Sequence, residues 1–143
     1  MTVLKWVLIA FGVLFFLGAA SLFGVLYWAS NVPTVQVTQA DLAIGGSYPP
    51  EEKQALLDAC NGRNVQKRDD TCACIADRAG TELSRFLRLV LTATLEGSAT
   101  KIVAVTKGLI ASGVSEEKTK EIEGESDQRF KSLMQACGLN QNQ

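Results

Sequence analysis

The feature that most constrains this chain is an uncharged, apolar run near its N-terminus, from Trp6 to Ala29. A helix of this length extends about 36 Å at 1.5 Å per residue, which exceeds the roughly 30 Å hydrocarbon core of a bilayer. Trp6 at one end, and Tyr27 with Trp28 at the other, are residue types that favour the headgroup level. The run therefore predicts one transmembrane helix over residues 6–29.

The distribution of basic residues predicts the orientation of this helix. Lys5 precedes the run, and no lysine or arginine follows it until Lys53. Because positive charge is retained in the cytoplasm, we expect a cytoplasmic tip at residues 1–5 and a periplasmic C-terminal domain on a bacterial inner membrane. A mitochondrial intermembrane-space domain fits the same pattern. A cleaved signal peptide ending at Ala20 is the alternative, but the apolar run continues for nine residues beyond it.

Small residues within the run predict close packing against other membrane helices. Ala20 and Gly24 form a small-xxx-small pair, and Gly12 and Gly18 add two further positions without a bulky side chain. The simpler interpretation is that glycine is common in membrane helices. We expect the partners of this segment to be other membrane-protein subunits and the lipid bilayer.

Residues 30–50 predict an extended linker, since Pro33, Gly45 with Gly46, and Pro49 with Pro50 interrupt any regular element. The segment is more apolar than a free tether requires. Contact with a partner, or strand addition to one, is therefore the alternative.

The remainder of the chain predicts an all-α domain over residues 51–138, followed by a tail at 139–143. Apolar residues recur at three- and four-residue spacings, which is typical of amphipathic helices. We expect a small antiparallel bundle of about four helices. Their predicted ranges are 51–60, 71–95, 99–112 and 116–137.

Four cysteines, Cys60, Cys72, Cys74 and Cys137, predict two disulfides in a domain outside the cytoplasm. Side chains that are two positions apart on a helix point in directions about 200° apart, so Cys72 and Cys74 should bond different partners. Cys72 and Cys137 both lie on apolar faces, which favours Cys72–Cys137 with Cys60–Cys74. The swapped pairing is nearly as compatible with the pattern.

The composition argues against most catalytic and ligand-binding chemistry. The chain has no histidine, the commonest general base and metal ligand. The Cys-x-Cys spacing differs from that of zinc sites, and no haem-attachment motif is present. A net charge of −1 provides no basic field for nucleic acid. We therefore predict no catalytic, cofactor or metal site and no small-molecule substrate. Thiol–disulfide exchange at Cys72 and Cys74, near a helix N-terminus, is the main alternative.

A polar stripe on the second predicted helix carries Arg78, Arg85 and Arg88. These residues would suit lipid phosphate or an acidic partner. A solvated face, with Arg78 and Arg85 paired to Glu82, is the simpler expectation.

Together these features predict a non-catalytic accessory, assembly or stabilising subunit of a larger inner-membrane complex. A membrane-tethered thiol–disulfide oxidoreductase and a periplasmic adaptor that recruits a soluble partner are the alternatives.

Overall fold

The computed structural model describes residues 27–63 and 70–139. The chain divides into two units, Met1–Pro33 and Thr34–Gln143, and each is described by itself. In the first unit, residues 27–31 are helical.

Most of the membrane helix predicted over residues 6–29 lies outside the described residues. So do the predicted helix-packing positions Gly12, Gly18, Ala20 and Gly24. Within the part of the chain that is described, no helix combines the length and the apolar character needed to cross a bilayer.

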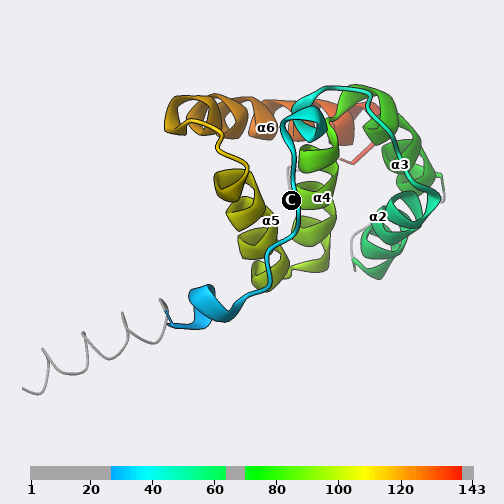
Figure 1. Cartoon of the computed structure of the whole chain (residues 1–143). Coiled ribbons are helices and arrows are strands. Elements are labelled where there is room, and N and C mark those ends of the chain that lie inside the picture. The colour runs from blue at the N-terminus through cyan, green and yellow to red at the C-terminus, as the bar shows by residue number, and fades with distance from the viewer. Residues whose placement is uncertain (1–26, 64–69, 140–143) are drawn as a thin grey trace, which may run out of the picture. The chain divides into compact units, whose positions relative to one another are not determined.

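The second unit is a helical bundle without strands over its described residues, which confirms the predicted all-α class (Figure 1). Its elements are η1 (Gln39–Leu42), α2 (Pro50–Gly62), α3 (Thr71–Glu82), α4 (Arg85–Glu96), α5 (Ala99–Ala111) and α6 (Glu116–Ala136). Helix α4 lies between α2 and α5, and α3 packs against both α2 and α6.

The single helix predicted over 71–95 is wrong, because Leu83 and Ser84 separate α3 from α4 in an extended conformation. The Ser84 hydroxyl accepts a hydrogen bond from the backbone N–H of Leu87, which caps the new helix. The apolar spacing continues through Leu83, Phe86 and Leu87, so the periodicity alone gave no sign of this break.

The other three predicted helices are confirmed, with ends that differ by at most two residues. Polar caps explain two of the starts: Ser98 accepts from the N–H of Lys101, and Ser115 accepts from the N–H of Lys118. Between α4 and α5, Gly97 has a positive φ of 69°, a left-handed conformation that suits glycine at a helix end.

Each of the five α-helices contributes a fully buried aliphatic side chain to one core. Burial of such side chains supplies the main stabilising free energy of a domain of this size. One residue from each helix, in chain order, is Leu56, Ile75, Leu91, Leu109 and Leu133.

Residues 34–48, here called the strap, pack onto the helices. The N–H of Val35 donates to the carbonyl oxygen of Ala104 in α5 at 3.2 Å, and Val37 is buried in the core. A Cβ at Gly108 would overlap the carbonyl of Val35, so glycine permits the close crossing. The segment expected to be an extended linker contains η1 and an isolated bridge at Ile44, and the strap is part of the packed domain.

Candidate functional site

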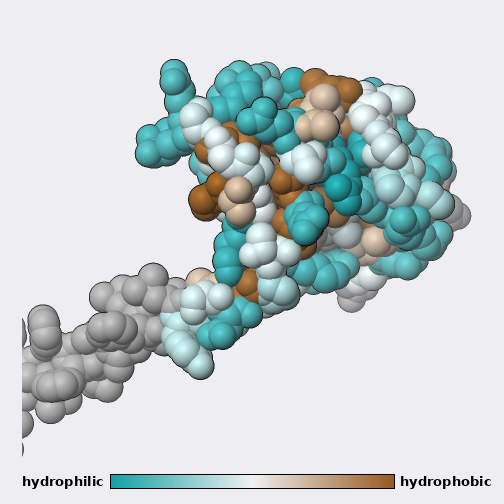
Figure 2. Space-filling view, in the orientation of Figure 1, coloured by the Kyte–Doolittle hydropathy of each residue, from teal (hydrophilic) through white to brown (hydrophobic). Residues whose placement is uncertain are grey.

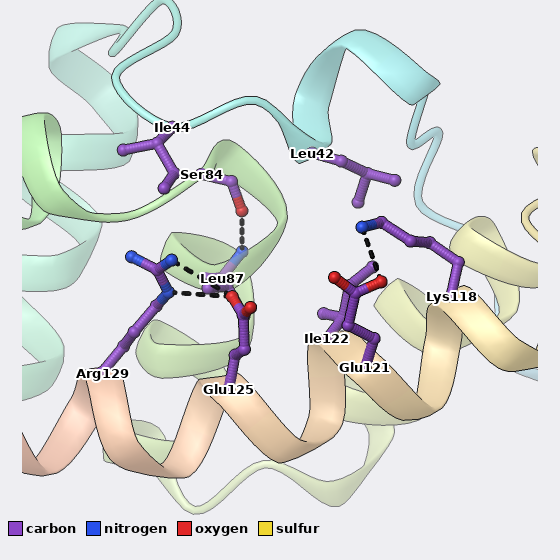
Figure 3. A pocket seen from close by; sticks show the side chains of 9 residues that line it. All are labelled: Leu42, Ile44, Ser84, Leu87, Lys118, Glu121, Ile122, Glu125 and Arg129. Carbon is purple, nitrogen blue, oxygen red and sulfur yellow. Dashed lines mark hydrogen bonds and ion pairs between the residues drawn. The ribbon is translucent and has the colours of Figure 1, made fainter.

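A groove of about 200 Å³ lies where the strap passes the N-terminus of α4 and the first half of α6 (Figure 3). Leu42 and Ile44 of the strap and Leu87 of α4 supply apolar side chains on one side. Ile122 faces them from α6. The groove is therefore a recess of mixed character, lined by these apolar side chains and by polar and charged ones.

Charged residues on α6 form the rim of the groove. The ammonium of Lys118 donates to Glu121 at 2.8 Å, and the guanidinium of Arg129 donates to Glu125 at 3.1 Å (Figure 3). Both ion pairs are formed along one exposed helix, so they contribute little to stability. Their balanced charges give the rim no net preference for an anion or a cation.

The strap side of the groove is fixed by its backbone. Ile44 forms an isolated antiparallel bridge with Ser84, the extended residue that caps α4. Ile44 is nevertheless 52% exposed, so the bridge holds an apolar residue at the surface.

Arg85 joins the strap to two helices. Its guanidinium donates to Glu52 of α2 at 2.7 Å and to Asp41 of η1 at 3.3 Å. The hydrogen bond to Glu52, followed by the one to Asp41, raises the pKa of Arg85 against the opposing effect of burial. The arginine is therefore a permanent cation that holds two acids together.

Asp41 also stabilises the local fold of the strap. Its carboxylate accepts from the backbone N–H of Thr38 at 2.8 Å and from the Thr38 hydroxyl at 2.9 Å. Partial burial acts to raise the pKa of Asp41, but the hydrogen bonds from Thr38 and Arg85 outweigh it and leave the pKa below its ordinary value.

Arg85, Asp41, Glu52, Tyr48 and Arg88 form a polar cluster beside the groove. Arg88 is its least expected member, because this arginine is only 1% exposed. Its guanidinium donates to the carbonyl oxygens of Leu83, at 3.0 Å, and Ser47, at 2.5 Å. It also lies 4.4 Å from the centre of the Tyr48 ring, a favourable cation–π distance. Burial lowers the pKa of Arg88. This residue thus attaches the end of the strap to α4.

Three polar atoms of the cluster are buried without a hydrogen-bond partner within the described protein. They are the Tyr48 hydroxyl, the second carboxylate oxygen of Glu52 and Nε of Arg88. Such atoms carry a desolvation cost, so the cluster gives up some stability in fixing the strap.

The predicted arginine stripe is only partly confirmed. Arg78 pairs with Glu82 at 2.6 Å on the surface, as the simpler interpretation expected. Arg85 does not pair with Glu82, and Arg88 is buried rather than solvated. The helix break after Leu83 changes the direction in which the two later arginines point, and this separates them from Arg78.

The favoured disulfide pairing is wrong, and the swapped pairing is correct. Cys60 bonds Cys72, and Cys74 bonds Cys137, so Cys72 and Cys74 do bond different partners. The favoured pairing placed α6 on the apolar face of α3. That face is instead covered by α2, which brings Cys60 to Cys72, while α6 reaches α3 at the position of Cys74.

These bonds use all four cysteines, and no thiol is free. Cys60, Cys72 and Cys137 are buried, whereas Cys74 is half-buried. The described residues contain no group of three or more acidic or cysteine side chains placed to hold a metal ion.

Comparison with family models, with curated proteins and with solved structures finds no match for this chain.

Proposed function

We propose that this protein is a non-catalytic accessory or stabilising subunit of a larger inner-membrane complex. In this proposal residues 6–29 span the membrane once, the N-terminus is cytoplasmic, and the helical domain is periplasmic. The apolar run, the single basic residue before it and the disulfides of the domain support this placement.

The main observation in support of the proposal is that all four cysteines form disulfides between helices. Each disulfide joins two different helices: Cys60–Cys72 ties α2 to α3, and Cys74–Cys137 ties α3 to the residue that follows α6. A thiol-exchange site requires an accessible reactive sulfur, whereas the Cys60–Cys72 bond is buried. Structural cross-links in a small external domain account for all four residues.

The groove supports a binding role for the domain. It is a recess that combines apolar and charged side chains, and the strap and α6 form its two sides. A subunit of a membrane complex needs such contact surfaces in addition to its membrane helix.

One observation favours a second candidate, a membrane-tethered thiol–disulfide oxidoreductase. Cys74 is half-buried and is the least buried of the four cysteines. In this case the Cys74–Cys137 disulfide would be the redox-active one and Cys60–Cys72 would be structural.

Purification in mild detergent tests the proposal. The account expects the full-length chain to co-purify with integral membrane subunits in a fixed ratio. It also expects this association to weaken when the apolar run is replaced by an unrelated membrane span. Purification as a free monomer, together with accumulation of reduced client proteins in a Cys74→Ser strain, would favour the oxidoreductase instead.

A further inference from the structure

Helix α5 carries a second apolar surface besides the one that faces the core. Its buried residues include Ala104, Val105, Gly108 and Leu109. At 3.6 residues per turn, a different set of side chains falls within an arc of about 100° on the outer side of the helix. This set, here called the outer stripe, consists of Ala99, Ile102, Val103, Thr106 and Ile110.

The outer stripe is partly exposed to solvent in the described domain. Ile110 is 65% exposed, Ala99 is exposed, and the other members are half-buried. Figure 2 shows hydrophobic residues reaching the surface over α5. One exposed and two half-buried aliphatic side chains aligned on one helix face form a contiguous apolar surface of the kind that meets a nonpolar partner.

The charge of α5 distinguishes it from the other exposed helix. Between Ala99 and Ala111 the sequence contains Lys107 and Lys101, which pairs with Glu96 at the end of α4, and no acidic residue. Helix α6, by contrast, has acidic and basic residues along its length. A helix with an apolar stripe and basic residues is suited to the headgroup region of anionic lipids.

Chain length limits how far α5 can be from the apolar run. Five residues, 30–34, separate Ala29 from Val35, and the N–H of Val35 is hydrogen-bonded to Ala104 of α5. Fully extended, this connection spans at most about 20 Å. A tether this short raises the local concentration of the bilayer at α5, so even a weak apolar contact is populated.

We infer that the outer stripe of α5 rests in the headgroup–acyl boundary of the bilayer that holds the protein's own membrane helix. The inference depends on the membrane anchor of the proposed function. It adds a second, peripheral membrane contact, made by Ile102, Val103 and Ile110, which fixes the orientation of the domain on the membrane.

A nitroxide spin label on a single introduced cysteine tests this inference in the full-length chain. Ile110→Cys places the label on the outer stripe, and Ala55→Cys is the control, an exposed small residue on α2. Both variants are labelled after disulfide formation and reconstituted into vesicles of phosphatidylethanolamine and phosphatidylglycerol. Circular dichroism checks that each retains its helix content.

The expected result is a label at position 110 that is several-fold less accessible to a water-soluble nickel chelate than the label at position 55, and more accessible to oxygen. Equal chelate accessibility at both positions, in protein that floats with the vesicles, would overturn the inference while leaving the anchor intact. Failure of the protein to float with the vesicles would overturn both the inference and the membrane anchor. Spectral broadening that disappears on dilution with unlabelled protein would instead identify a second copy as the partner and also overturn the inference.

Discussion

The guanidinium of Arg88 lies 4.4 Å from the centre of the Tyr48 ring, and this contact joins the end of the strap to the central helix. The same side chain donates to the carbonyl oxygen of Ser47. A buried cation therefore fixes two consecutive strap residues.

Replacing Arg88 should destabilise the domain more than replacing any exposed arginine. Arg88→Ala leaves the buried carbonyl of Leu83 without its donor, which costs about 1–3 kcal/mol, and it also removes the hydrogen bond to Ser47 and the contact with the Tyr48 ring. Arg78→Ala is the matched control, because it removes an exposed ion pair worth at most about 1 kcal/mol. Urea unfolding measures both. Equal midpoints for the two variants would contradict the assignment of Arg88 as the residue that holds the strap.

Asp41 should make stability depend on acidic pH. Its pKa in the folded domain lies below the ordinary 3.8, so its stabilising contribution is fully present above that ordinary value. The contribution is lost as the pH falls through the folded-state pKa. Asp41→Asn should therefore reduce the acid-induced loss of stability, measured by urea unfolding at neutral and acidic pH. Asp127→Asn is the control, since Asp127 forms an exposed pair with Lys131; the same reduction in both variants would contradict this role.

Two glycine substitutions should have opposite effects on the stability of the domain. Gly108→Ala places a Cβ against the carbonyl of Val35 and should detach the strap or displace it. Gly124→Ala lies in α6 with no atom within 4 Å of the added carbon, so it should stabilise the helix by about 0.5–1 kcal/mol. Thermal unfolding of the two variants gives the comparison. A Gly108→Ala variant that unfolds at the same temperature as the unchanged protein would show that the strap does not cross α5 closely.

The two disulfides should contribute unequally to the stability of the folded domain. Removing Cys74–Cys137, whose cysteines are 63 residues apart, should cost about 4 kcal/mol in the chain-entropy model, more than removing Cys60–Cys72, at a separation of 12. Paired cysteine-to-serine variants test this by unfolding and by abundance in membranes. In an accessory subunit, loss of the complex should follow loss of abundance. An oxidoreductase would lose activity at normal abundance.

The helical class and most helix ends could be predicted because they depend on local signals. Apolar spacing, Ser98 and Ser115 as caps, and Pro50 at a helix start each act within a few residues. The break at Ser84 escaped detection because a serine within a continuing apolar pattern resembles any other polar position. The structure shows that this serine caps α4 and that its backbone is bridged to Ile44 of the strap.

The disulfide pairing and the burial of Arg88 depend on tertiary contacts. The positions of Cys72 and Cys74 on their helix predicted that they bond different partners, but the choice of partner depends on which helices cover α3. The burial of Arg88 depends on the carbonyl of Ser47 and the ring of Tyr48 in the strap, about forty positions earlier in the chain. Helical periodicity contains no information about such distant partners, so the groove and its neighbouring cluster could not be predicted from sequence.

Native mass spectrometry of the protein released from membranes in mild detergent tests the central claim most directly. The account predicts a chain that retains residues 1–29, has all four cysteines oxidised, and is bound to integral membrane subunits in a defined stoichiometry. A chain that begins at Ser21 and migrates free of other membrane proteins would contradict it.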